Sequence, residues 1–151
     1  FRKEKSEYLA GWQRTRADFI NARKEEEKER EDFIKFAESR LLEELLILSD
    51  SFDSVLKNQE LMAKLDKDWQ GGIKNIYSQL TKIFKDRNVS VIEALGKPFN
   101  PEEHEAIENV LVKEETKNQI VIEEISAGYK LYERVLRPAK VKVGVYKNNN
   151  Q

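Results

Sequence analysis

Apolar residues recur with an eleven-residue period from Tyr8 to Leu56. An eleven-residue repeat gives about 3.67 residues per turn, so it keeps one apolar seam on one side of a nearly straight helix. A seven-residue frame fits less well because it places charged residues such as Lys5 and Arg40 in the seam. The stretch contains no proline and only one glycine, Gly11. We expect a long coiled-coil helix of about 70 Å, at ~1.5 Å per residue, paired with a second copy of itself.

The seam of this helix is predicted to hold the two copies together. Its apolar members are Tyr8, Trp12, Phe19, Ile34, Leu41, Leu45 and Leu48. Between Phe19 and Phe33 the seam carries Arg23, Glu26 and Arg30 instead. Burying one large apolar side chain contributes about 1.5–3 kcal/mol. We therefore expect this section to open on warming before the rest of the helical region does.

The apolar phase changes between Lys57 and Asp68, where Asn58 and Asp66 are good helix caps. This change predicts the end of the long helix and the start of another. The run Ser49–Ser54 also contains several cap-forming residues, which makes it a second position for a kink or a break.

A second apolar seam follows, with alternating steps of four and three residues. It consists of Trp69, Ile73, Ile76, Leu80 and Ile83. This spacing is typical of a left-handed helical bundle, and two chains with two such helices each would form a four-helix bundle. Gly71 and Gly72 lie inside this helix, where each costs about 1 kcal/mol relative to alanine. Either they lie in a frayed first turn, or another backbone approaches closely there.

The sequence after Asn88 changes to short, alternating, β-branched segments that predict strands. The expected strands cover residues 89–92, 119–122 and 140–145, with a hairpin turning at Tyr132-Glu133. Asn100-Pro-Glu-Glu103 has the cap, proline and glutamate typical of a helix start.

The predicted fold class is therefore α+β. Residues 1–88 are expected to form a helical stalk and dimerisation bundle, residues 89–146 a compact β-domain, and residues 147–151 a frayed tail.

Composition narrows the function classes. Charged residues make up 36% of the chain, but 27 Lys and Arg against 28 Asp and Glu leave a net charge of -1, as in a solvated helical protein. The absence of cysteine excludes disulfides and thiol chemistry. No apolar run reaches the ~18 residues of a membrane span, and Phe1–Lys5 lacks the apolar region of a signal peptide. We expect a cytoplasmic protein without a membrane partner; the mitochondrial matrix or another organelle lumen is the alternative.

No catalytic or metal-binding constellation is evident. His104-Glu-Ala-Ile-Glu108 resembles half of a zinc-protease helix motif, but Glu108 stands where the second histidine is needed. Glycine-rich phosphate loops are absent, and the glutamate pairs 114–115 and 123–124 lie in polar surroundings. We therefore expect no enzyme activity, no metal and no cofactor.

The C-terminal half is asymmetric in charge. Between Glu93 and Glu124 there are nine acids and three lysines, a net charge of −6, whereas residues 128–147 carry a net charge of +5. The basic residues are Lys130, Arg134, Arg137, Lys140, Lys142 and Lys147. Such a region can simply aid solubility, or it can steer an acidic partner. RNA is a weaker alternative because no stacking motif accompanies the charges, and we expect no nucleic-acid partner.

The chain resembles the GrpE family, the nucleotide exchange factors of DnaK-type chaperones, over nearly its whole length. The residues that carry the resemblance are Phe19–Lys24, Phe36-Ala37, Leu45-Leu46, Asp50, Gly72-Ile73, Gly96–Ala106 and Gly128–Val141. The resemblance implies a parallel homodimer with a paired-helix stalk, a four-helix bundle and one β-domain per chain. It also implies that a β-domain wedges against the chaperone's nucleotide-binding domain and releases ADP.

The family's partner contacts can be carried over to individual positions. The resemblance implies apolar contacts at Phe99, Pro101, Ile125 and Val143, a cationic contact at Arg134 and a point of close approach at Gly72. For Phe99 and Val143, packing in the core is the alternative. The expected function is thus a homodimeric co-chaperone that promotes ADP release. The alternative is a structural coiled-coil scaffold whose basic β-domain docks another acidic protein.

Three positions depart from the family's pattern. Ile47 replaces a proline, so the stalk helix is expected to continue into the bundle. Asn88 replaces a frequent glycine before the first strand, and Tyr132-Glu133 replaces a short polar hairpin tip. In the family, unwinding of the paired helices reduces exchange at high temperature. The charged section from Arg23 to Arg30 is therefore our candidate for a thermosensor.

Overall fold

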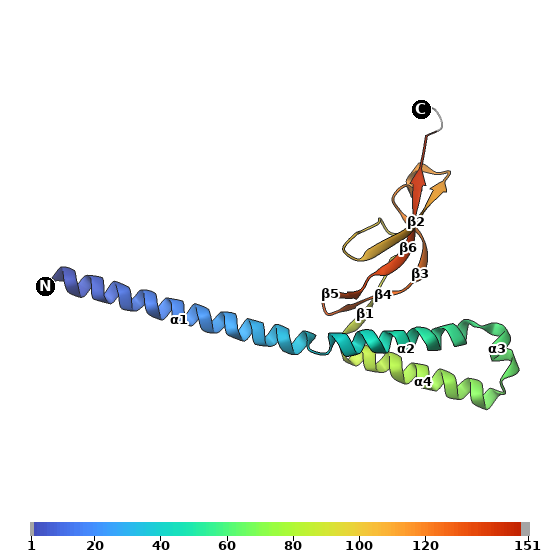
Figure 1. Cartoon of the computed structure of the whole chain (residues 1–151), viewed down its shortest axis with the longest axis horizontal. Helices are drawn as coiled ribbons and strands as arrows, with labels where there is room; N and C mark the ends of the chain where they lie inside the picture. Colours follow the sequence, from blue (N-terminus) through green and yellow to red (C-terminus); the bar gives the residue numbers. More distant parts are fainter. Residues whose placement is uncertain (1, 149–151) are drawn as a thin grey trace. The chain divides into compact units, whose positions relative to one another are not determined.

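The computed structural model describes residues 2–148, which form helices in the first part and strands in the second (Figure 1). The helices are α1 (Arg2–Phe36), α2 (Ser39–Lys57), α3 (Gln59–Lys64) and α4 (Lys67–Asp86). The strands are β1 (Val89–Ile92), β2 (His104–Val112), β3 (Val121–Ser126), β4 (Gly128–Leu131), β5 (Arg134–Arg137) and β6 (Ala139–Tyr146). A 3-10 turn covers Glu115–Lys117. The predicted α+β class is confirmed.

Two compact units make up the chain, and they divide between Glu38 and Ser39. The first contains α1, and the second contains α2–α4 together with the strands. A separate domain at 89–146 therefore stays a prediction; we call residues 89–146 the β-region. The end of the predicted tail, residues 149–151, lies outside the described residues. Within residues 2–148, no helix is both long and apolar enough to cross a membrane.

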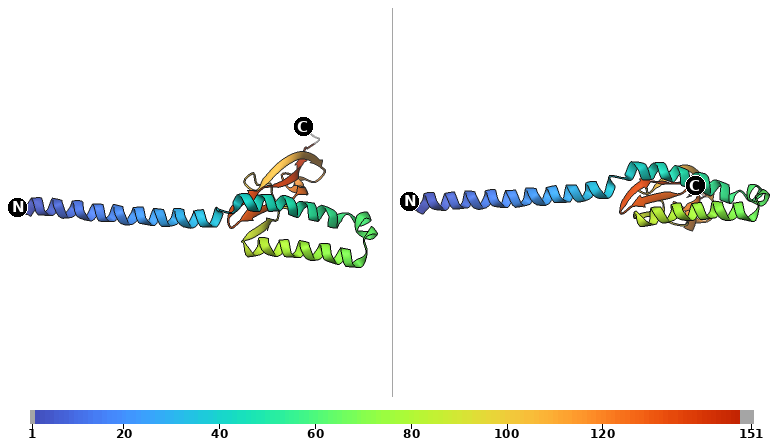
Figure 2. Two further views of the ribbon diagram at one scale, coloured as in Figure 1. Left: turned by 60° about the horizontal axis from the view of Figure 1, so that its bottom comes forward. Right: turned by 90° about the horizontal axis from the view of Figure 1, so that it is seen from below.

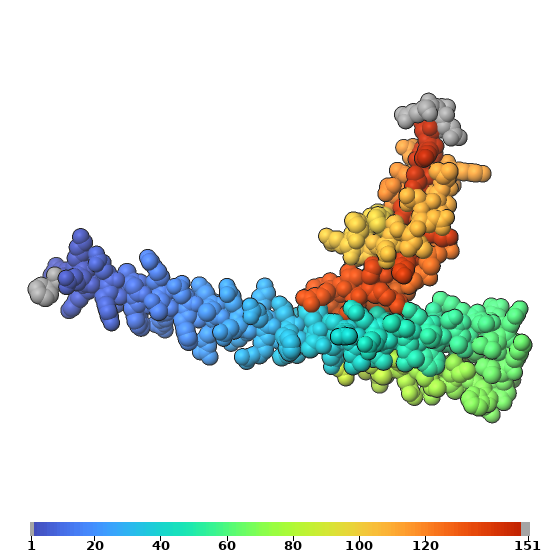
Figure 3. Space-filling view, viewed as in Figure 1, coloured from blue at the N-terminus to red at the C-terminus, as the bar shows by residue number. Residues whose placement is uncertain are grey.

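Helix α1 is exposed from Arg2 to Lys35, and Phe36 at its end is half-buried. None of its described residues is buried, and Figure 3 shows side chains projecting along this helix. The prediction of one unbroken helix to Leu56 is wrong at Ala37 and Glu38, which form a turn between α1 and α2. Both residue types are acceptable in helices, so their propensities do not explain the interruption. Helix α2 then passes unbroken through Ile47.

Helices α2 and α4 lie side by side (Figure 2). Leu42 and Leu46 of α2 are 2% and 0% exposed, and Leu80 and Phe84 of α4 are also buried. Burying such side chains contributes about 1.5–3 kcal/mol each. This apolar contact stabilises the helical part of the second unit within one chain.

The predicted break between Lys57 and Asp68 is confirmed. The Asn58 side chain accepts a hydrogen bond from the amide of Leu61, and the Asp66 side chain accepts one from the amide of Trp69 at 2.9 Å. These bonds satisfy amides that the first turns of α3 and α4 leave without helical partners.

The helix does not break at Ser49–Ser54, because α2 continues through that run; a kink there stays a prediction. The Ser51 hydroxyl donates to the Ile47 carbonyl four residues earlier, at 3.3 Å. A serine that bonds back to the carbonyl four residues earlier allows the helix to continue, and such a bond often bends it.

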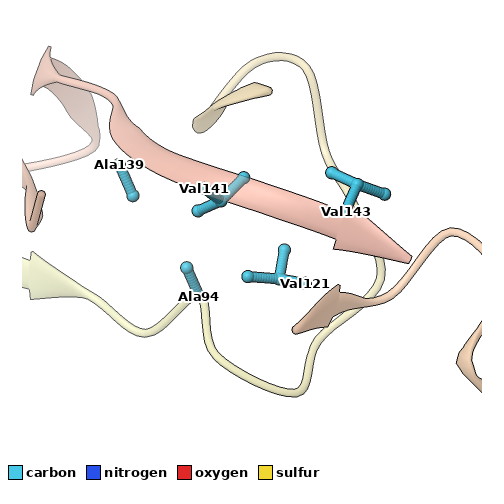
Figure 4. Packing of buried hydrophobic residues seen from close by; sticks show 5 residues of the cluster. All are labelled: Ala94, Val121, Ala139, Val141 and Val143. Atoms are coloured by element: carbon cyan, nitrogen blue, oxygen red, sulfur yellow. The ribbon is translucent and has the colours of Figure 1, made fainter. Parts of the chain in front are cut away.

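The β-region contains two three-stranded sheets, with strand orders β1-β4-β5 and β2-β6-β3. Strand β6 is central in its sheet, parallel to β2 and antiparallel to β3. The core cluster of the β-region consists of Ala94, Val121, Ala139, Val141 and Val143 (Figure 4). The half-buried Phe99 packs against this cluster. The strands predicted at 89–92 and 140–145 and the hairpin at Tyr132-Glu133 are confirmed; the strand expected at 119–122 begins at Val121.

The predicted helix start at Asn100 is wrong. Asn100 does behave as a cap, since its side-chain oxygen accepts from the amide of Glu102 at 3.0 Å and its carbonyl accepts from the amide of His104 at 2.8 Å. The chain then enters β2, which pairs with β6 from His104 to Val112. Long-range pairing with β6 therefore overrides the local helix signal.

Two departures from the family pattern lie together. Asn88 and Tyr132 both have a positive φ, 64° and 51°, a conformation that favours glycine or asparagine. The Asn88 side-chain amide donates to the Tyr132 hydroxyl at 3.0 Å, and the Tyr132 amide donates to the Asn88 carbonyl. Their mutual hydrogen bonds help to hold this backbone in place.

Candidate functional site

An apolar groove lies on α4. It has a volume of about 220 Å³ and is lined by Asp68, Trp69, Gly72, Ile73 and Ile76. Trp69 is 67% exposed, which is unusual for the largest apolar side chain. Most residues of this groove are therefore exposed in the single chain, and only Ile73 is half-buried.

Gly71 and Gly72 lie beyond the capped first turn of α4, which begins at Lys67. The frayed-turn interpretation therefore does not fit. A Cβ added at Gly72 would meet nothing within 4 Å in this chain. Close packing does not explain the glycine here, so the close-approach interpretation requires a second molecule.

Most of the predicted dimerisation residues are exposed in the single chain. The exposed ones are Tyr8, Trp12, Phe19, Ile34, Leu41, Leu48, Trp69, Ile76 and Ile83, whereas Leu45 and Ile73 are half-buried. Leu80 differs, because it is buried within its own chain. That position contributes to the packing of one chain in addition to any role in a bundle.

The predicted partner contacts in the β-region have different environments. Arg134 is exposed at the start of β5, Pro101 is exposed in the turn before β2, and Ile125 on β3 is 47% exposed. Arg134 belongs to the β1-β4-β5 sheet and Ile125 to the other sheet. These three side chains are accessible to a partner.

For Val143 the structure favours the alternative of core packing over a partner contact. Its side chain is only 2% exposed and belongs to the core cluster (Figure 4). The reason is its place on β6, the central strand of its sheet, where Val141 and Val143 share the inner face. Phe99 packs against the same cluster, so core packing accounts for part of its surface.

Several of the basic residues counted in the sequence form ion pairs within the described part of the chain. Lys130 pairs with Glu103, and this hydrogen-bonded pair lowers the pKa of Glu103. Lys142 pairs with Glu108 at 3.2 Å and with Glu123 at 3.5 Å. Arg137 pairs with Asp50. The charge asymmetry is therefore weaker in space than along the sequence.

The surroundings of His104 indicate a structural role. It is 5% exposed, and its Nδ1 accepts a hydrogen bond from the Asn100 amide at 3.0 Å. Its Nε2 is buried without a hydrogen-bond partner, and the Phe99 ring lies 5.9 Å away. Across residues 2–148, no group of three or more His, Cys, Asp or Glu side chains could hold a metal ion. His104 helps to fix the turn before β2.

Sequence reasoning missed one notable pair, Asp50 and Arg137. The two residues are 87 positions apart, so no local pattern relates them. The available signal was that both lie in segments that resemble the family, one in the helical part and one in the β-region.

Comparison with known proteins gives a consistent result. The family model for GrpE matches residues 1–145. Protein GrpE of Carboxydothermus hydrogenoformans is 41% identical over 130 residues, which cover 84% of this chain and 63% of that protein. Protein GrpE of Gloeobacter violaceus is 32% identical over 146 residues, covering 95% and 72%. Protein GrpE of Sulfurovum sp. is 35% identical over 143 residues, covering 91% and 77%. The chain therefore belongs to the GrpE family.

Proposed function

We propose that this protein is a homodimeric co-chaperone that binds the nucleotide-binding domain of a DnaK-type chaperone and promotes ADP release. The observation that carries the proposal is the GrpE family match, which extends over residues 1–145 and so includes both the helical part and the β-region. In this proposal the protein acts by binding alone, in the cytoplasm, and supplies no catalytic group.

Dimerisation is supported by the uncovered apolar surface of the helices. Helix α1 has no buried residue among Arg2–Phe36, and the α4 groove around Trp69 is open. Contiguous exposed apolar surface usually marks an interaction site. A second copy offers the matching seam, and α2 and α4 of two chains would then form the four-helix bundle.

Chaperone binding is assigned to the β-region. Arg134 offers an exposed guanidinium, and Pro101 and Ile125 offer exposed apolar surface. A partner shifts a conformational equilibrium only by its preference for one state. In this proposal the β-region binds the open nucleotide cleft more tightly than the closed cleft, and ADP dissociates from the open state.

Release of fluorescent ADP from a DnaK-type chaperone, followed with and without this protein, tests the proposal. We expect faster release that saturates with added protein. The scaffold alternative predicts a dimer without any effect on release. Arg134→Ala is the informative variant, because acceleration that survives it unchanged would place the contact elsewhere.

A further inference from the structure

Arg137, the last residue of β5, connects the β-region to α2. Its Nη1 donates to Asp50 Oδ2 at 2.5 Å, and its Nη2 donates to Asp50 Oδ1 at 3.0 Å. Such two-pronged arginine–carboxylate pairs are stronger and more directional than single hydrogen bonds. The hydrogen bonds to Asp50 hold the pKa of Arg137 above its ordinary value.

The β-region side of this contact is fixed. Arg137 Nε and Nη2 both donate to the Ala127 carbonyl, at 3.1 and 2.8 Å. The guanidinium also lies over the Tyr129 ring, 5.3 Å from its centre. Next to Ala127, Gly128 is pressed against β6, since a Cβ there would come within 2.9 Å of Ala139 Cα. Arg137 is therefore held rigidly by β4 and its neighbours, and it presents its remaining donors to α2.

The surroundings of this pair are loosely packed. A cavity of about 370 Å³ lies beside it, lined by residues of α2, by Tyr77 of α4, by residues 124–127 and by Tyr129. Asp50 is 47% exposed at its side chain, against 23% for Arg137. A dense apolar interface would fix the angle between helix and strands by itself, but a junction with a cavity does so poorly.

We propose that Arg137 is a positioning residue that latches the β-region to α2 through Asp50, and so sets the orientation in which Arg134 meets the chaperone. Strand β5 begins with Arg134 and ends with Arg137, so the two side chains are about 10 Å apart along one strand at ~3.3 Å per residue. The latch fixes one end of this strand and the other end carries the proposed contact. The second half of this inference rests on the proposed function, whereas the latch itself does not.

Distance measurements between two spin labels test the latch directly. The chain has no cysteine, so labels can be placed at exposed Lys74 of α4 and exposed Asn109 of β2, with unlabelled protein added in excess to isolate distances within one chain. We expect Asp50→Asn and Arg137→Met each to broaden the distance distribution, and wild-type protein to broaden at high salt. The matched control is Lys142→Met, which removes a cation from ion pairs confined to one sheet and should leave the distribution unchanged.

The ADP-release assay tests the consequence. Asp50→Asn should raise the concentration for half-maximal exchange about tenfold while the rate at saturation stays near wild type, because a competent orientation is still visited. Narrow, unchanged distributions in both variants would overturn the latch. If Arg137→Met fails to fold, Asp50→Asn alone tests the latch. The Asp50 side chain is half exposed, so this substitution should leave the fold intact. A latch confirmed by distances in a protein without exchange activity would contradict the proposed function and leave the latch standing.

Discussion

Helices α1 and α2 differ in what covers them, although the sequence predicted them as one continuous element. Among the described residues Arg2–Phe36 of α1 none is buried, whereas Leu42 and Leu46 of α2 are almost fully buried. Helix α2 carries apolar residues on two faces: one packs inside its own chain, and the other, with Leu41 and Leu48, stays exposed. The folding of α2 is therefore supported by its own chain, whereas no residue of α1 among Arg2–Phe36 is buried by the described part of the chain.

This difference predicts two levels of stability. A solvated helix gains only about 0.2–0.5 kcal/mol from each i,i+4 charge pair, and most helical stability in proteins comes from packing. The second unit has its own apolar contacts in the helices and in the β-region. The first unit should thus respond to protein concentration, and the second to changes in its own core.

The largest expected effect is in the core of the second unit. Leu46→Ala should lower the free energy of unfolding by about 2–5 kcal/mol, because it deletes a fully buried side chain and leaves a cavity. Urea unfolding measures this. Leu41→Ala is the matched control on the exposed face of the same helix: it should mainly make the unfolding midpoint more dependent on protein concentration. Equal losses from both variants would contradict the two-face description of α2.

Arg134→Ala should affect binding and leave both units folded. Losing one partner of a buried charge contact costs about 2–5 kcal/mol at an interface, while the exposed position of Arg134 predicts little change in unfolding. Calorimetry with a DnaK-type chaperone measures the affinity.

Gly72→Asp should also impair exchange, since it adds bulk and charge to the open α4 groove. If Gly72→Asp instead abolishes the dimer, Gly72 serves the dimer contact of this groove and is not a contact with the chaperone.

The sequence could predict elements whose signals are local. Asn58 and Asp66 cap their helices as expected, and the alternation around Val141 gave the strand that became β6. Strand β2 could not be predicted in this way, because a genuine cap at Asn100 precedes it and only pairing with β6 makes it a strand.

The candidate site was predictable only in part. Arg134, Pro101 and Ile125 are exposed, as partner contacts must be. Val143 is buried. This could not be predicted, because the sequence does not show which face of β6 points inward until both neighbouring strands are known. The net charge counted along the sequence also did not predict that Lys130 and Lys142 are paired, because their acidic partners come from distant segments. Long-range contacts decided each of these outcomes.

The two units should open at different temperatures. The section of α1 around Arg23 and Arg30 lacks the seam contacts that contribute about 1.5–3 kcal/mol for each large apolar side chain. We therefore propose that this section opens first on warming, as a thermosensor. Hydrogen exchange should show residues 20–33 losing protection at a lower temperature than residues 69–84. Longer protection of 20–33 would exclude the idea. Arg23→Leu with Arg30→Leu should raise the first transition and leave the second nearly unchanged.

The smallest expected effect is an acid dependence confined to the second unit. The hydrogen bond from Lys130 lowers the pKa of Glu103 below its ordinary value of 4.5. A carboxylate with a lowered pKa in the folded state stabilises the fold above its unfolded pKa, and this contribution is lost as the pH falls below that value towards the folded pKa. The Glu103 side chain is 28% exposed and that of Lys130 is 31% exposed, so solvent screening keeps the contribution within about 1 kcal/mol.

Glu103→Gln tests this assignment because it keeps the shape of the side chain and removes the titrating group. Wild-type and variant unfolding free energies should differ most above pH 5, and the difference should shrink as the pH falls below 4.5 towards the folded pKa of Glu103. The transition of α1, followed by a label near Trp12, should show no difference between the two proteins at any pH, since Glu103 lies in the other unit. A pH-independent difference between wild type and Glu103→Gln would mean that packing of the side chain, and not its charge, supports the turn before β2.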